Sequence, residues 1–150
     1  MERRRTEDDD VWLASLLGIE VYTLHNVVED ARILPLLGVR ELEFVEEEGR
    51  RMLRTVLDST PMDDIRGLSS SERGRVLIVL AIATARVAAR FVPTLLLLDS
   101  FMATFDEKNL SGLAEVLSDS ENHFQTVALV PERGPDWEPL SPLWTFIHLT

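Results

Sequence analysis

The stretch LSSSER, from Leu68 to Arg73, precedes a long apolar run, and TLLLLD, from Thr94 to Asp99, follows that run. A serine-rich turn that opens a helix presents free backbone N–H groups, which can bind an anion. A carboxylate at the end of an aliphatic strand is a hard oxygen ligand, which suits a cation such as Mg²⁺. The two stretches in this order therefore indicate nucleotide chemistry. No G-x-x-x-x-G-K followed by Ser or Thr occurs in the chain, so it lacks the usual phosphate loop.

The composition is that of a folded, acidic protein. The 150 residues are 45% hydrophobic and 27% charged, so the chain can bury one sizeable core, and one domain is expected. The formal net charge of -11 disfavours a generally basic nucleic-acid surface, so any DNA contact is expected to be indirect, through a partner. The absence of cysteine excludes disulfides and thiolate metal sites, and it agrees with a reducing cytoplasm.

The N-terminus predicts neither export nor membrane insertion. Aspartates stand at positions 8 to 10, where a signal peptide would continue with apolar residues. We interpret residues 1–10 as a charged tail and residues 11–150 as a single domain. The longest apolar run, Val76 to Ala89, is interrupted by Arg86 and is too short to span a bilayer core of about 30 Å. A cytoplasmic protein without membrane contact is expected.

The first half of the domain predicts helices and one edge strand. Val11 to Leu17 is a short helix or a strand that ends at Gly18, and the pattern leaves both open. Asn26 to Leu37 is predicted as a helix. Val39 to Val45 alternates apolar with charged side chains, which is typical of an edge strand. Glu46 to Leu57 has apolar residues at helical spacing and is predicted as a helix, and the segment after it has the composition of a loop.

Three basic side chains lie within that predicted helix. They are Arg50, Arg51 and Arg54, which we interpret as part of a solvated helix end rather than a basic binding face. The histidines are scattered without ligand spacing and are interpreted as structural or exposed.

The second half predicts a βαβ unit behind a central helix. The helix that starts at Ser70 or Ser71 carries apolar side chains around most of its circumference, which indicates burial on more than one side. The aliphatic run after it lacks polar alternation, as does a parallel strand covered on both faces. The predicted elements are a helix to about Arg90, a strand over 95–98, a helix over 108–117, a strand over 126–130 and a last strand over 146–149.

The predicted fold class is therefore α/β, with a short, mainly parallel sheet flanked by helices. Without further strands, one face or edge of this sheet is expected to remain uncovered, which favours association with another surface.

Residues 68 to about 131 resemble the C-terminal half of an ABC-type ATPase head, in the style of the SMC and RecF-like families. Leu68 to Arg73 resembles the signature motif LSGGE followed by Arg or Lys, with serines in place of the two glycines. Leu95 to Asp99 resembles the Walker B strand, and Thr104 to Asp106 resembles the D-loop. Gln125 to Val130 resembles the strand that leads to the switch histidine.

The resemblance implies a composite site for ATP and Mg²⁺. In this family two heads enclose two ATP molecules, and the phosphate loop of one head faces the signature motif of the other. Ser69 and the backbone N–H groups at the start of its helix would bind the γ-phosphate across the interface. Asp99 would hold Mg²⁺, and Asp106 would lie at the dimer seam. The candidate cofactor-binding residues are Ser69, Ser70, Ser71, Glu72 and Asp106, and the candidate metal ligand is Asp99.

Departures from the family pattern argue against independent hydrolysis. Ser100 follows Asp99 at the position where the family has a glutamate that polarises the attacking water. Loss of that general base slows such a step by about 10² to 10⁴-fold. Pro131 stands at the position of the switch histidine, and the phosphate loop is missing. We therefore assign no catalytic residue.

Each motif also has a structural interpretation. The serines at 69 to 71 suit a helix N-cap, and Asp99 can cap the turn that follows its strand. Three hypotheses remain. The chain is a degenerate or split ABC/SMC-like lobe that completes an ATP site with a partner carrying the phosphate loop, or within a homo- or heterodimer. It is a nucleotide-independent interaction module that keeps the fold. It is a piece of a longer DNA-repair or phage-defence ATPase. We favour the first and third over the second.

Overall fold

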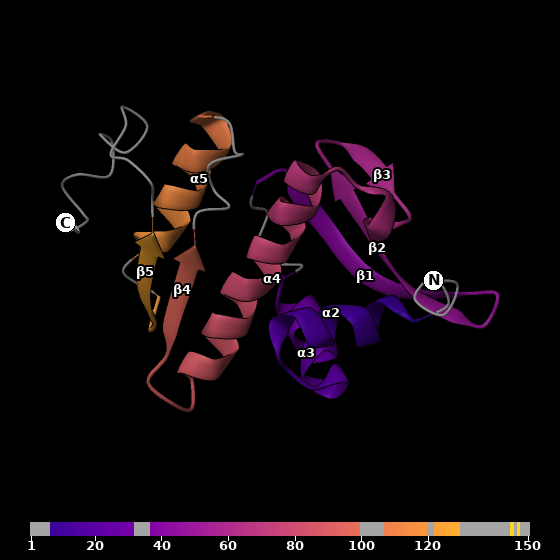
Figure 1. The fold of residues 1–150 in the computed structure, drawn as a ribbon, viewed down its shortest axis with the longest axis horizontal. Helices are drawn as coiled ribbons and strands as arrows, with labels where there is room; N and C mark the ends of the chain where they lie inside the picture. Colours follow the sequence, from indigo (N-terminus) through magenta and orange to yellow (C-terminus); the bar gives the residue numbers. More distant parts are fainter. Residues whose placement is uncertain are drawn as a thin grey trace.

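The structure, a computed structural model, describes residues 7–31, 37–99, 107–119 and 122–129, together with Thr145 and Ile147 (Figure 1). The elements in chain order are α2 (Asp9–Leu17), α3 (Val21–Ala31), β1 (Val39–Glu47), β2 (Arg50–Leu57), β3 (Thr60–Met62), the 3-10 helix η1 (Ile65–Gly67), α4 (Ser70–Ala89), β4 (Leu95–Asp99), α5 (Glu107–Leu117) and β5 (Gln125–Leu129).

The described strands form two sheets. One is antiparallel with the order β1-β2-β3, and the other is the parallel pair β4-β5. The predicted combination of helices and strands is confirmed as a mixed α/β fold. The predicted parallel sheet is found in part, as the pair β4-β5, whereas the larger antiparallel sheet was not predicted.

Helix α4 lies between the two sheets, as Figure 1 shows, and it contacts α3, β1 and β4. Its buried side chains surround most of the helix, which confirms the predicted burial on more than one side. These buried residues are Arg75, Val76, Ile78, Val79, Leu80, Ile82, Ala83 and Ala85. The helix ends at Ala89 with Arg90 as its C-cap, shortly before Pro93, which lacks the N–H that a further helical turn would need.

Strands β1 and β2 form a hairpin where the sequence predicts a helix over 46–57. Glu48 and Gly49 form its two-residue turn, with left-handed φ values of 52° and 74°. The side chains that β2 buries alternate along the strand and are Leu53, Thr55 and Leu57. The helix prediction is wrong because this period of two coexists with the helical spacing, and pairing with β1 decides between them. The predicted edge strand over 39–45 is confirmed as β1.

The remaining predictions differ mainly at their boundaries. The open alternative at residues 11–17 resolves as helix α2, which ends at Gly18 with a φ of 68°. The helix predicted over 26–37 is found as α3, which starts earlier, at Val21, and is described to Ala31, while residues 32–36 lie outside the described residues. The predicted loop over 58–67 contains β3 and η1. The helix over 108–117 and the strand over 126–130 are found as α5 and β5. Apart from Ile147, the strand predicted over 146–149 lies outside the described residues.

Among the described residues, the parallel pair is covered on one face. Leu96 and Leu98 are 8% and 2% exposed, whereas Leu95 and Leu97 are 58% and 60% exposed. The exposed apolar side chains of this face, which we name the outer row, are Leu95, Leu97, Val127 and Leu129. The expectation of cover on both faces is therefore wrong, and the expectation of an uncovered face is confirmed.

The aspartates at the start of α2 are anchors rather than part of a charged tail. Asp9 and Asp10 are fully buried. The carboxylates of Asp8 and Asp9 accept the backbone N–H groups of Arg51 and Leu53, at 3.2 and 2.9 Å. β3 pairs with β2 only from position 55 onward. Before that position, the carboxylates accept the backbone N–H groups of β2 that a neighbouring strand would otherwise bind. The tail boundary at residue 10 is wrong because these distant partners hold the aspartates.

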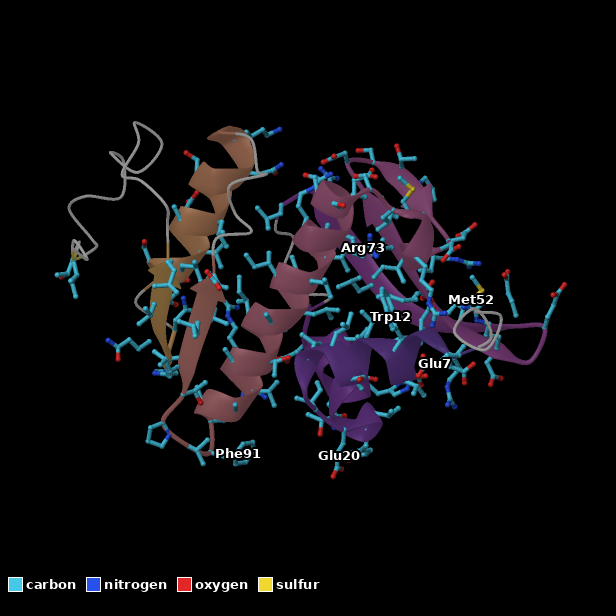
Figure 2. All side chains as sticks on the ribbon, in the orientation of Figure 1. Glu7, Trp12, Glu20, Met52, Arg73 and Phe91 are labelled. Carbon is cyan, nitrogen blue, oxygen red and sulfur yellow. The ribbon has the colours of Figure 1, made fainter. Side chains whose placement is uncertain are left out.

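Arginine side chains compensate the buried carboxylates. The Nε atom of Arg66 lies 3.3 Å from Asp9, and its guanidinium lies 5.1 Å from the centre of the Trp12 ring, which is labelled in Figure 2. Asp10 lies 2.9 Å from Nε2 of His25, whose ring packs on another aromatic side chain, Phe44. The ion pairs found where a solvated helix end was expected are Arg50 with Asp9, Arg51 with Asp8 and Asp10, and Arg54 with Glu47 and Asp63.

Within the part of the chain that the structure describes, no single helix combines the length and apolar content needed to cross a membrane. Helices α2 and α3 meet that requirement only together, as a pair bent by 91°.

The burial of Asp9 predicts a pH effect on stability. Burial raises the pKa of Asp9 above its usual 3.8, and the Leu53 N–H and the nearby Arg66 and Arg50 offset this only in part. Because the folded-state pKa is the higher one, ionised Asp9 costs stability near neutral pH, and this cost disappears as the pH falls through the folded pKa.

We therefore expect the free energy of unfolding of the wild type, relative to Asp9→Asn, to rise as the pH falls from about 7 to about 4. Urea denaturation of both proteins at several pH values measures this difference. A difference that is constant, or that shrinks on acidification, contradicts the assignment.

Candidate functional site

The serine-rich stretch lies at the exposed start of α4. Ser69 is the N-cap, and its Oγ accepts the backbone N–H of Glu72 at 3.2 Å. Glu72 Oε1 in turn accepts the backbone N–H of Ser69 at 3.0 Å, which completes a capping box. Ser69 and Ser70 are exposed and Ser71 is half-buried. The structure therefore brings the four candidate residues together at the surface, and it also shows the structural role that a cap provides.

Glu72 places a negative charge at the start of α4. The hydrogen bonds from Ser69, backbone first and then side chain, hold the pKa of the Glu72 carboxyl below its usual 4.5. The carboxylate stabilises the helix because the N-terminal end of a helix carries partial positive charge. An anion that approaches Ser69 meets this carboxylate as well as the free N–H groups.

Asp99 is the last residue of β4, is exposed, and lies opposite Leu129 of β5. Figure 1 shows that α4 and β4 run in opposite directions and that β4 ends about halfway along α4. In α/β proteins, ligands bind outside the carboxyl ends of the strands. Asp106, Ser100 and Pro131 lie outside the described residues.

A magnesium site at Asp99 needs further ligands. Among the described residues, no group of three or more His, Asp or Glu side chains is arranged to hold a metal ion. Asp99 offers a carboxylate, which Mg²⁺ accepts, and Mg²⁺ completes its octahedron with waters and nucleotide phosphates when few protein ligands are present. The residue type therefore fits, as one ligand of a shared site.

Arg75 joins the start of α4 to the antiparallel sheet, and the sequence analysis missed it. Its Nη1 donates to the Asp58 carboxylate at 3.0 and 3.1 Å and to the carbonyl of Leu37 at 3.0 Å. Leu37, Gly38 and Asp58 all have left-handed φ values. A Cβ at Gly38 would lie 2.1 Å from Asp58 Oδ1, so glycine is required there. The sequence feature that could have pointed to Arg75 is its place as a charged residue directly before the apolar run of the helix.

The sequence matches none of the family models and none of the curated proteins with which it was compared. The fold does match solved structures. One of them, from work on ATP-driven dimerization and DNA-stimulated activation of SMC ATPases, gives a TM-score of 0.56 at 15% sequence identity. The match covers 74% of this chain and 70% of that chain, so the two chains are of similar length. The chain is thus structurally similar to an SMC ATPase head domain, and at this identity the likeness shows the fold alone.

The capping box predicts unequal roles for neighbouring serines. Ser69→Ala removes the acceptor of the Glu72 N–H, so we expect it to lower the free energy of unfolding by about 1 kcal/mol. Ser70→Ala leaves both capping bonds intact and serves as the control. We also expect the pKa of Glu72 to rise towards 4.5 in Ser69→Ala only. Urea denaturation and NMR titration of the carboxyl carbon measure the two effects, and equal effects of both variants contradict the assignment.

Proposed function

We propose that the chain is one lobe of a split or degenerate ABC/SMC-like ATPase, which completes a composite ATP site with a partner that carries the phosphate loop. One combination carries this proposal: a fold similar to an SMC ATPase head, with LSSSER at the exposed start of its central helix. The fold alone serves many functions. The motif at this position supports a nucleotide role because it offers donors on the surface where a second protein can reach them.

In this proposal the start of α4 binds the γ-phosphate of ATP. The first backbone N–H groups of a helix have no acceptor within the helix. The hydroxyl of Ser69 accepts the backbone N–H of Glu72, and its one hydrogen, which also serves the Glu72 carboxylate, would turn to donate to a phosphate oxygen. Ser70 and Ser71 add further donors in the same turn. Asp99 supplies one oxygen ligand to Mg²⁺, and Asp106 lies at the seam with the partner.

Slow turnover follows from the residues that stand at the family's glutamate and switch-histidine positions. Ser100 has no basic group at neutral pH to polarise a water molecule, and Pro131 has no side-chain donor. Bound ATP would therefore serve to hold the two proteins together more than to drive repeated hydrolysis. We place this assembly in the cytoplasm, with DNA contacted through the partner, in DNA repair or phage defence.

The outer row offers the surface for the partner lobe. Parallel sheets are normally covered on both faces, and here β4 and β5 have one bare apolar face. Burying leucine and valine side chains is favourable by roughly 1.5 to 3 kcal/mol each, before the costs of association are subtracted. A lobe that covers this face can thus also bring its phosphate loop to the carboxyl end of β4.

A second candidate is a nucleotide-independent interaction module that keeps the ATPase fold. The capping box favours it, because Ser69 and Glu72 satisfy each other within the chain. The outer row favours it equally, because it is available without nucleotide.

ATP binding by the mixed proteins tests the first candidate. A protein that contains a phosphate loop and copurifies with the chain is mixed with it, and Mg-ATP is titrated by calorimetry into each protein and into the mixture. We expect binding to strengthen at least about tenfold on mixing, because half of the site comes from each protein. Ser69→Arg should remove this gain by filling the phosphate position. Ser15→Arg, on the exposed side of α2, is the control.

An unchanged ATP affinity in the Ser69→Arg mixture rejects the composite site. Association that is identical with and without Mg-ATP favours the interaction module instead.

The outer row gives an independent prediction for the interface. Leu97 is 60% exposed, so Leu97→Glu leaves the core intact but places a charge in the surface that the partner would bury. We expect association with the partner to weaken at least about tenfold, which corresponds to roughly 1.4 kcal/mol. Tyr22→Glu changes a residue of α3 that is 76% exposed and should have no effect. Sedimentation measures association, and circular dichroism shows whether each variant is folded. Equal effects of the two variants on association would show that the outer row is not the interface.

A further inference from the structure

Arg75 is a buried positive charge, and its ionic partner in the described part of the chain is the exposed Asp58. Its side chain is 8% exposed, whereas the side chain of Asp58 is 64% exposed. The Nη1 atom makes the hydrogen bonds to Asp58 and Leu37, while the buried Nε atom has no hydrogen-bond partner within the described ranges. The guanidinium is therefore fixed in place, but its charge is neutralised mainly by a carboxylate that water and other proteins can reach.

Arg75 belongs to the same face of α4 as the residues of its first turn. It stands three positions after Glu72 and four after Ser71, the spacing at which helical side chains are neighbours, and side chains of a helix lean towards its N-terminus. The charges of both partners act on the Glu72 carboxyl. The positive charge of Arg75 lowers the pKa of Glu72 and the negative charge of Asp58 raises it, both after the larger effect of Ser69. The pair therefore contributes to the electrostatic potential at the cap of α4.

We propose that Asp58 and Arg75 together set the affinity of the α4 start for a phosphate group. Arg75 supplies a fixed positive charge near this site, and Asp58 supplies an exposed negative charge that a partner can neutralise. This inference rests on the proposed function, because it concerns regulation of the same nucleotide site. A basic side chain of a partner that neutralises Asp58 would raise the positive potential at Ser69 and strengthen phosphate binding there. The turn between β2 and β3 thus becomes a place where contact with another protein changes nucleotide affinity.

The two members of the pair should act in opposite directions. Asp58→Asn keeps the shape of the side chain, and asparagine tolerates the left-handed φ of 50° at this position. It leaves the charge of Arg75 uncompensated. Arg75→Gln removes that charge, whereas Arg75→Lys keeps it. A purely structural pair predicts a different pattern, in which loss of either partner loosens the same turn and weakens the site.

NMR titration of the Glu72 carboxyl in the chain alone tests the inference without any partner. We expect the Glu72 pKa to fall in Asp58→Asn, to rise in Arg75→Gln and to stay near its wild-type value in Arg75→Lys. Thermal unfolding and amide spectra establish that each variant is folded. Asp63→Asn, which removes an exposed acid that pairs with Arg54, is the control for a general loss of negative charge.

Mg-ATP affinity in the mixture with the phosphate-loop partner gives the second measurement. We expect roughly two- to fourfold tighter binding for Asp58→Asn and similarly weaker binding for Arg75→Gln, with both effects shrinking as salt is added. Opposite shifts of the Glu72 pKa support the inference. Shifts in the same direction, or none, overturn it, whatever the ATP result. If the pKa shifts are opposite but no mixture binds Mg-ATP, the proposed function fails while the electrostatic role of the pair stands.

Discussion

The burial of α4 between two sheets is the constraint on which the structure depends. The sides of this helix are buried but its first turn is exposed, and side chains of that turn satisfy part of its free backbone groups. Ser69 and Glu72 do this through two reciprocal hydrogen bonds, and Arg75 ties the next turn to the carbonyl of Leu37. The orientation of the serine-rich turn is therefore set by the core, and a nucleotide would meet a turn that is already ordered.

Local signals predicted the second half of the fold. The start of α4 at Ser70 and the strand Leu95–Asp99 were predictable because a serine cap and an uninterrupted aliphatic run act over a few residues. The same applies to the position of Asp99 at a strand end. The uncovered face of that strand was predicted only from the small number of predicted strands. The leucine run itself does not indicate whether one face of the strand or both faces are covered.

Non-local contacts explain the failures. The segment 46–57 satisfies a helical and an alternating pattern, and its pairing with β1 decides between them. Asp8 to Asp10 resembles a solvated tail until Arg51 and Leu53 are brought beside it from more than forty positions away. Arg75 and Asp58 meet only after the hairpin has formed, so no spacing in the sequence predicts that the start of α4 is tied to the sheet.

The outer row of Leu95, Leu97, Val127 and Leu129 also affects the life of the chain after synthesis. Extended apolar side chains in water are what chaperones and proteases act upon when they sort incompletely folded proteins. A molecule whose outer row stays uncovered is open to recognition by chaperones and proteases, and a molecule whose outer row is covered is protected from them. The quantity of this protein that accumulates in a cell would then be set by the supply of whatever surface shields the row, and copies made in excess would be degraded.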